Sequence, residues 1–249
     1  MRLLKWEKLP LDMQTEEVRK YYDILKKKRC ALFFKRAFDI FVSLLMLIIL
    51  SPIFLILAIM IKIDSRGPVF YRQERITQYG KKFRIFKFRT MVVNADQIGT
   101  QVTVNNDSRI TRIGKFLRKT RLDEISQLID VLRGTLTFVG TRPEVSQYVN
   151  QYTDEMKATL LLPAGVTSEA SIRYKDESEL LDAAGDAADK IYVEKILPSK
   201  MKYNLYSLKT FGFWKDIKVM FMTVFAVLGK DYKDTLNTET INEKTEDEE

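Results

Sequence analysis

The chain has 249 residues, of which 46% are hydrophobic, so it can bury a sizeable core. It holds one cysteine, Cys30, and no histidine, which excludes an internal disulfide, His-ligated zinc and nucleophile pairs that use histidine. The formal net charge is +8, and the last 19 residues hold eight acids and two bases, so residues 1–230 carry +14. This excess of positive charge on residues 1–230 favours an anionic partner: a phosphorylated ligand, an anionic membrane surface or nucleic acid.

Residues 1–32 are polar and amphipathic, and we interpret them as an N-terminal extension. Residues 33–63 are predicted to be a membrane element, because the 22 residues from Ile40 to Ile61 carry no formal charge. As one straight helix this segment would be about 33 Å long, sufficient for a hydrocarbon core of about 30 Å. The alternative, a core helix of a soluble domain, is disfavoured by such long uninterrupted apolarity.

Ser51-Pro52 interrupts this segment at its middle. Pro52 has no N–H, so the carbonyl of Ile48 loses its helical partner, and the Ser51 hydroxyl can bond a carbonyl one turn back. Bases flank both ends of the segment, and bases mark the cytoplasmic side, so we expect a helix that enters, bends and returns. A spanning helix with a proline kink is the alternative. The flanking bases are Lys26, Lys27, Lys28, Arg29, Lys35 and Arg36, then Lys62, Arg66, Arg72, Arg75, Lys81, Lys82 and Arg84.

The elements predicted after residue 63 indicate an α+β, mostly helical fold in which residues 64–230 form one domain. Val219–Gly229 is apolar but too short to cross a membrane, and it follows Trp214 and two phenylalanines. It is therefore either an interfacial amphipathic helix or a core helix. The acidic residues 231–249 are predicted to be disordered. The other predictions are strands near 69–71 and 83–88, turns at 67–68 and 79–80, a helix over 110–134 that Gly134 ends, short strands within 135–175, and helix over 176–210.

Two adjacent acids, Asp123 and Glu124, follow a basic stretch. A local explanation is that Thr120 caps a helix beginning here and that both acids favour its positive end. A second interpretation is a metal and phosphate site, because five bases precede the pair within a dozen residues. An acid at a helix N-terminus also stays ionised, as a carboxylate nucleophile must. The five bases are Arg112, Lys115, Arg118, Lys119 and Arg121.

Two further motifs supply cations. Alternation along Phe86–Met91 would place Lys87 and Arg89 on one face, where they could clamp a diphosphate; a half-buried strand with a solvated basic face is the alternative. In Phe138–Pro143 a glycine and a proline flank Arg142, so a tight turn would present its guanidinium rigidly.

Taken in their order along the chain, these motifs resemble those of bacterial sugar transferases of the monotopic phosphoglycosyl transferase superfamily. These enzymes are also called polyprenyl-phosphate hexose-1-phosphate transferases. The resemblance extends over about residues 33–230. It is carried by Lys35-Arg36-Ala37-Phe38-Asp39, Ser51-Pro52, Gly67-Pro68-Val69-Phe70-Tyr71-Arg72-Gln73-Glu74-Arg75, Lys87-Phe88-Arg89-Thr90-Met91, Gly114–Glu124, Gln127-Leu128, Phe138–Pro143 and Asp216-Ile217-Lys218.

The resemblance implies a monotopic protein of the bacterial inner membrane, with a re-entrant helix bent at Ser51-Pro52, interfacial helices and a small cytoplasmic catalytic domain. It implies that Asp123 attacks the β-phosphate of a UDP-sugar, that UMP leaves, and that undecaprenyl phosphate takes the sugar phosphate from the aspartyl intermediate, initiating a surface glycan. Mg²⁺ is expected at Asp123 and Glu124, while Lys87, Arg118 and Arg142 match positions that handle phosphates. The expected partners are these two substrates and membrane lipids, without nucleic acid; a homodimer is left open.

The chain departs from the family pattern in three places. Many members have Pro-Arg-Pro where this chain has Thr141-Arg142-Pro143, and Arg-Pro-Gly-Ile-Thr-Gly-Trp where it has Leu162–Ser168. A family aspartate corresponds to Asn204 here. The last two departures motivate an alternative, a relative that keeps the scaffold but lacks activity. They also leave the sugar of the UDP-sugar donor undetermined. A second alternative, an adaptor that binds anionic lipid or nucleic acid, is disfavoured because the bases cluster around the acid pair.

Overall fold

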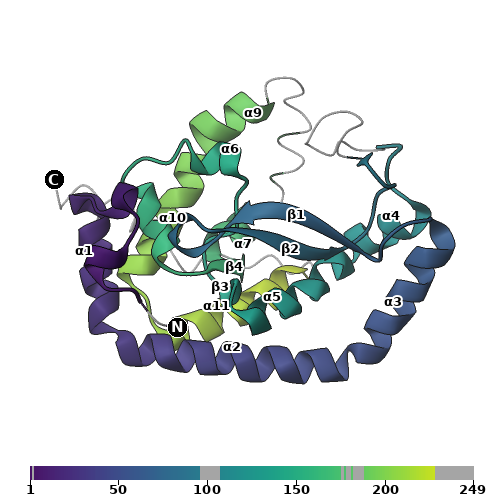
Figure 1. Ribbon diagram of the computed structural model, residues 1–249, viewed down its shortest axis with the longest axis horizontal. Coiled ribbons are helices and arrows are strands. Elements are labelled where there is room, and N and C mark those ends of the chain that lie inside the picture. Colours follow the sequence, from purple (N-terminus) through teal and green to yellow (C-terminus); the bar gives the residue numbers. More distant parts are fainter. Residues whose placement is uncertain (2, 96–106, 175–176, 178–180, 182–187, 228–249) are drawn as a thin grey trace.

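The protein is described here by a computed structural model, which covers residues 1, 3–95, 107–174, 177, 181 and 188–227 (Figure 1). The predicted acidic tail and part of the helix predicted over 176–210 lie outside these residues. The helices are α1 (Glu16–Lys27), α2 (Arg29–Ile49), α3 (Ser51–Asp64), α4 (Arg112–Lys119), α5 (Leu128–Arg133), α6 (Ser146–Val149), α7 (Glu169–Arg173), α9 (Ala188–Ile191), α10 (Leu197–Lys209) and α11 (Phe213–Val227). The strands are β1 (Phe70–Ile76), β2 (Lys82–Phe88), β3 (Leu136–Val139) and β4 (Ala164–Thr167). Short 3₁₀ turns are η1 (Trp6–Lys8), η2 (Leu11–Met13), η3 (Gln78–Gly80), η5 (Leu122–Gln127) and η6 (Met156–Leu161), and Tyr192–Ile196 is a π-helix, η8.

The predicted α+β, mostly helical fold is confirmed, with two small sheets at its centre (Figure 1). β1 and β2 form an antiparallel hairpin that pairs Phe70 with Phe88, and the turn between them includes Tyr79 and Gly80, both at positive φ. β3 and β4 are parallel and pair Leu136 with Ala164.

Helix α1 packs on the body of the protein. The Thr15 side chain caps it by accepting the Val18 N–H, and its apolar face lies in one buried cluster with Leu161 of η6 and Leu208 of α10. The first 32 residues therefore share their core with segments more than 120 positions later in the chain. This core follows from the amphipathic pattern of the sequence.

The apolar segment forms two helices, α2 and α3, which bend by 61° at the predicted break. As predicted, the Ser51 hydroxyl donates to the carbonyl of Ile48, at 2.8 Å, and so satisfies the acceptor that Pro52 leaves without an amide donor. Among the described residues no single helix is long and apolar enough to cross a membrane. The bent pair α2 and α3 together has sufficient length and apolar composition.

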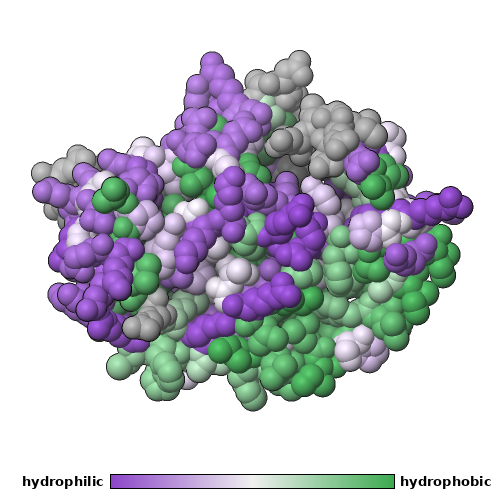
Figure 2. Space-filling view, in the orientation of Figure 1, coloured by the Kyte–Doolittle hydropathy of each residue, from purple (hydrophilic) through white to green (hydrophobic). Residues whose placement is uncertain are grey.

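Much of the apolar surface of α2 and α3 is exposed. Figure 2 shows the hydrophobic residues gathered along the lower and right edges, where Figure 1 places these two helices. Helix α11 is divided: Val219 is buried, whereas Trp214 and Phe221 are exposed, so it is partly a core helix and partly an exposed apolar one. The exposed apolar residues of α2 and α3 include Phe33, Phe34, Phe41, Leu44, Leu45, Ile48, Ile49, Leu55, Ile56, Ile59 and Ile63. A contiguous apolar surface of this kind marks an interaction site on a protein.

The single helix predicted over 110–134 is wrong. Helix α4 ends at Lys119, Arg121 adopts a left-handed conformation with φ of 57°, and the 3₁₀ turn η5 separates α4 from α5. Thr120 does not cap a new helix, because its hydroxyl donates back to the carbonyl of Phe116, at 2.9 Å, and closes α4. Gly134 ends α5 as predicted, with φ of 85°.

Candidate active site

The acid pair lies on η5, where the chain reverses after α4. Helix α4 sits tightly on the backbone that follows β2: a Cβ at Gly114 would lie 2.0 Å from the Thr90 carbonyl oxygen. The left-handed Arg121 then turns the chain, which is rare for a residue with a side chain. This turn brings Asp123 and Glu124 back over β2.

Two cations that are distant in sequence hold Glu124. Its Oε1 accepts hydrogen bonds from Lys87 Nζ of β2 at 3.1 Å and from Arg142 Nη2 at 3.0 Å. Burial alone would raise the pKa of Glu124, but the attraction of Arg142 and Lys87 outweighs it and holds that pKa well below its usual range. Glu124 therefore remains a carboxylate and raises the pKa of Arg142 in return.

Asp123 has a different environment from its neighbour. Among the described residues no other side chain donates a hydrogen bond to its carboxylate; Ser126 Oγ reaches only its backbone carbonyl, at 3.4 Å. Burial raises the pKa of Asp123 and the charge of Glu124 raises it further, while Lys87 and Arg118 lower it. The site thus contains one carboxylate bound by two cations beside a second to which, in the described part of the chain, no side chain donates.

Lys87 is positioned through the backbone of Phe86. The Phe86 amide donates to Asp130 Oδ2 of α5 at 2.7 Å, and its carbonyl accepts from Ser126 Oγ at 3.1 Å. These two bonds attach β2 to η5 and α5, so the next side chain, Lys87, meets Glu124. Sequence reasoning missed Ser126 and Asp130. Asp130, an acid within an apolar helix about two turns after the acid pair, was a visible signal, but the sequence did not indicate its partner.

Arg142 follows a tightly packed bend at Gly140, just after β3, rather than the tight turn that was predicted. A Cβ at Gly165 would fall 2.2 Å from the Gly140 carbonyl oxygen, so only glycine allows β3 and β4 to approach this closely. The far side of the bend is tied to β1, where the Ile76 amide donates to the Glu144 carbonyl at 2.9 Å.

The other two predicted phosphate-binding residues lie differently. Arg118 is held by a bond from its Nε to Thr90 Oγ1 at 3.0 Å, and its charge acts on Asp123. Arg89 is not brought to the acid pair: it is only 4% exposed, and its guanidinium donates to the Ser65 carbonyl at 2.7 Å at the end of α3. The predicted shared face of Lys87 and Arg89 is therefore corrected, because β2 ends at Phe88 and the alternation stops there.

Comparison of the sequence with known protein families gives a match. Residues 30–230 match the family described as bacterial sugar transferases. The chain belongs to this family.

The curated relatives of this chain have names that contain different sugars. A UDP-N-acetylgalactosamine-undecaprenyl-phosphate N-acetylgalactosaminephosphotransferase of Aeromonas hydrophila is 33% identical, over 79% of this chain and 44% of its own length. A UDP-glucose:undecaprenyl-phosphate glucose-1-phosphate transferase of Klebsiella pneumoniae is 35% identical, over 77% and 39%. An undecaprenyl-phosphate galactose phosphotransferase of Salmonella typhimurium is 32% identical, over 82% and 42%. The chain thus spans about two fifths of the length of these relatives.

In this protein, the N-terminal part of the broken helix is joined to β3. Lys35 is buried, donates to the Val139 carbonyl at 2.8 Å and pairs with Asp216 of α11. One turn later the buried Asp39 accepts from Thr137 Oγ1 at 2.8 Å. The strand that leads to Arg142 is therefore attached to α2.

The C-terminal part of the broken helix is joined to α4. Asp64 Oδ2 accepts the Ile113 amide at 3.0 Å, and Leu57 and Ile61 pack with Phe88 and Leu117. The helix that carries Arg118 is therefore attached to α3. Sequence reasoning missed the roles of Asp39 and Asp64, although an acid at each border of an apolar segment was a visible signal.

Proposed function

We propose that this sugar transferase moves a sugar-1-phosphate from a UDP-sugar to undecaprenyl phosphate, initiating a surface glycan. The observation that carries the proposal is the unequal acid pair: Glu124 is bound by two cations, while the adjacent Asp123 carboxylate keeps its oxygens available. An available carboxylate among cations suits nucleophilic attack on a phosphoryl group.

In the first step, a carboxylate oxygen of Asp123 forms a bond to the β-phosphorus, and the bond from that phosphorus to the bridging oxygen breaks, releasing UMP. In the second step, a phosphate oxygen of undecaprenyl phosphate attacks the same phosphorus, and the Asp123 carboxylate leaves unchanged. Lys87, Arg118 and Arg142 stabilise the charge that develops on the phosphoryl oxygens. Glu124 keeps Lys87 and Arg142 in place through its two hydrogen bonds.

The acid pair fits a Mg²⁺ ion. Protein sites commonly hold this ion by one or two carboxylates together with substrate phosphates, so Asp123 and Glu124 suffice without a larger cluster of acids. No group of three or more potential metal-ligating residues occurs in the described part of the chain. When bound, the ion would neutralise phosphate charge.

We further propose that α2 and α3 form a re-entrant element and that the site lies on the cytoplasmic face of the bacterial inner membrane. Both ends of the broken helix are attached to the same body, through Lys35 at one end and Asp64 at the other. A helix that crossed the membrane would leave its two ends on opposite sides, which this attachment opposes. Exposed bases also remain at both ends, including Lys27, Arg29 and Lys62, although Lys35 and Arg36 bond inside the protein.

UMP release tests the reaction. The chain in nanodiscs is incubated with undecaprenyl phosphate, Mg²⁺ and each of UDP-glucose, UDP-galactose and UDP-N-acetylgalactosamine. We expect UMP release with at least one of them, and loss of release in Asp123→Asn. Absence of UMP with every donor would favour the inactive relative. Full activity of Asp123→Asn would refute Asp123 as the nucleophile.

Cysteine labelling tests the topology. The one native cysteine, Cys30, is exposed at the start of α2, and Ile63 is exposed near the end of α3. A membrane-impermeant maleimide should label Cys30 in the native chain and Ile63→Cys in a Cys30→Ser background from the same side of sealed vesicles. Labelling from opposite sides would favour the kinked spanning helix.

A further inference from the structure

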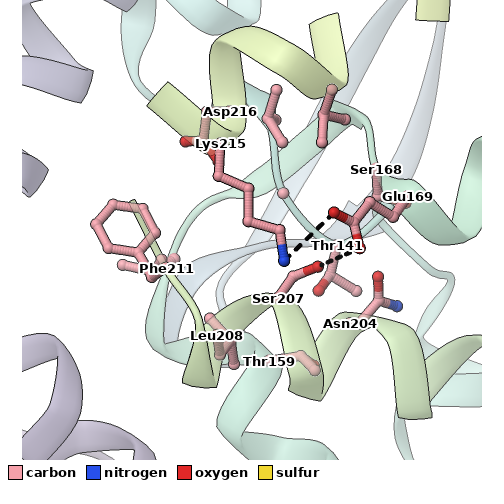
Figure 3. A pocket seen from close by; sticks show the side chains of 14 residues that line it. Thr141, Thr159, Ser168, Glu169, Asn204, Ser207, Leu208, Phe211, Lys215 and Asp216 are labelled. Atoms are coloured by element: carbon pink, nitrogen blue, oxygen red, sulfur yellow. Dashed lines mark hydrogen bonds and ion pairs between the residues drawn. The ribbon is translucent and has the colours of Figure 1, made fainter. Parts of the chain in front are cut away.

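A pocket with apolar walls and a few polar side chains lies beside Gly140 and Thr141, and Asp123 and Glu124 do not line it. Its walls come from the end of β3, the start of α7, α10 and the start of α11. Figure 3 shows Glu169, Ser207, Asn204 and Thr141 pointing toward one another across it. Leu208, Phe211 and Val219 line its apolar side.

Asn204 is the unusual member of this pocket. Its residue is only 5% exposed, yet within the described chain its side chain makes one hydrogen bond, from Nδ2 to Met201 Sδ at 3.8 Å. A carboxamide offers two donors and one acceptor oxygen with two lone pairs, so most of the hydrogen-bonding capacity of Asn204 is unused within the described chain. This amide is therefore poised for a polar ligand that enters the pocket.

The remaining polar groups indicate what kind of ligand fits. Glu169 pairs with Lys215 at 3.3 Å and accepts from Ser207 Oγ at 3.4 Å (Figure 3). The buried carboxylate opposes entry of a phosphate and leaves the pocket without a positive excess. A carboxylate, an amide and hydroxyls around a partly apolar wall instead match the hydroxyl and acylamino groups of a sugar.

The pocket shares part of its wall with a second cavity, which Arg142 lines. Thr141, Thr159 and Leu162 line both cavities. Arg142 contacts Glu124 at 3.0 Å. The stretches that depart from the family pattern, around Leu162 to Ser168 and at Asn204, also meet in this pocket.

We propose that the pocket of Glu169, Asn204 and Ser207 binds a neutral hydroxyl or acylamino group of the donor sugar and selects which UDP-sugar is used. This inference rests on the proposed function, because it assumes that the chain uses a UDP-sugar. The choice among UDP-sugars is argued from the pocket. These three residues would then determine which sugar is accepted. The acid pair and its cations would not distinguish one sugar from another, because they act on the phosphates.

Selectivity is measured as the ratios of kcat/KM among the three UDP-sugars, with the full chain in nanodiscs. We expect Asn204→Asp and Ser207→Ala to change at least one ratio tenfold or more, because a pocket that bonds a sugar group loses that discrimination when its partner changes. Ser199→Ala is the matched control, since it removes a hydroxyl of the same helix that bonds the Lys195 carbonyl and does not line the pocket. Ratios within twofold of the parent in both pocket variants would overturn the proposal.

Saturation-transfer NMR on the same nanodiscs separates the pocket from the reaction and from the nucleotide. The sugar protons of the preferred UDP-sugar should receive saturation in the parent and lose most of it in Asn204→Asp, while the uracil protons keep theirs. Equal loss on the uracil protons would show a nucleotide pocket and refute selection of the sugar. A parent without turnover but with this pattern would refute the proposed function and leave the pocket supported.

Discussion

The ion pair between Lys35 and Asp216 joins the broken helix to α11 and to the end of β3. The Lys35 side chain is 4% exposed and that of Asp216 is 16% exposed, so the pair is largely removed from water. Lys35 also donates to the Val139 carbonyl at 2.8 Å. We predict that Lys35→Met and Asp216→Leu each destabilise the protein strongly and that the double variant recovers most of the loss.

The magnitude follows from the burial of the pair. Removing one partner of a buried ion pair leaves an uncompensated charge and costs about 3–5 kcal/mol, whereas replacing both by apolar groups is often close to neutral. Lys35→Met also leaves the Val139 carbonyl without its donor, which adds about 1 kcal/mol. If the double variant loses only about 1 kcal/mol, the coupling free energy between the two positions should therefore be about 6 kcal/mol or more.

The assay is thermal unfolding in one detergent, followed by tryptophan fluorescence. For a chain of this size, 1 kcal/mol corresponds to about 2–4 °C, so each single variant should lower Tm by about 10 °C. Burial raises the pKa of Asp216, and without Lys35 that pKa rises further. The deficit of Lys35→Met should accordingly shrink as pH falls, because the carboxyl group takes up a proton. A double variant that loses the sum of the two single losses would refute the reasoning.

Four further predictions concern the site and its support. Arg142→Lys keeps the charge but loses the planar fork, and we expect kcat/KM for UMP release to fall about 100-fold; an unchanged value would exclude a catalytic role. Because burial raises the pKa of Asp123, activity should decline on the acid side above the ordinary aspartate pKa of about 3.9, and a profile that stays flat to that pH would contradict this. Arg89→Met should lower Tm while leaving the KM for the UDP-sugar within twofold; a selective rise in KM would return Arg89 to the phosphate site. Gly165→Ala should abolish the folded yield because of the 2.2 Å clash, whereas Gly212→Ala, with no neighbour nearer than 3.9 Å, should not.

Several features followed from the sequence because their causes are local. The apolar length of the α2–α3 segment, the break at Ser51-Pro52 with its bond to Ile48, and the end of α5 at Gly134 depend on neighbouring residues alone. The acid pair and the cations Lys87, Arg118 and Arg142 were also identified there, by residue type, motif order and family resemblance.

The partners of these residues depend on contacts across the fold. Lys87 and Glu124 are 37 positions apart in the chain, and the structure brings them together through Ser126 and Asp130, which bond the backbone of Phe86. Arg89 follows the same local pattern as Lys87 but is drawn to the carbonyls at the end of α3. A sequence specifies which side chains carry charge; only tertiary packing decides which opposite charge lies within hydrogen-bond distance, and that contact separates Glu124, held by two cations, from the available Asp123.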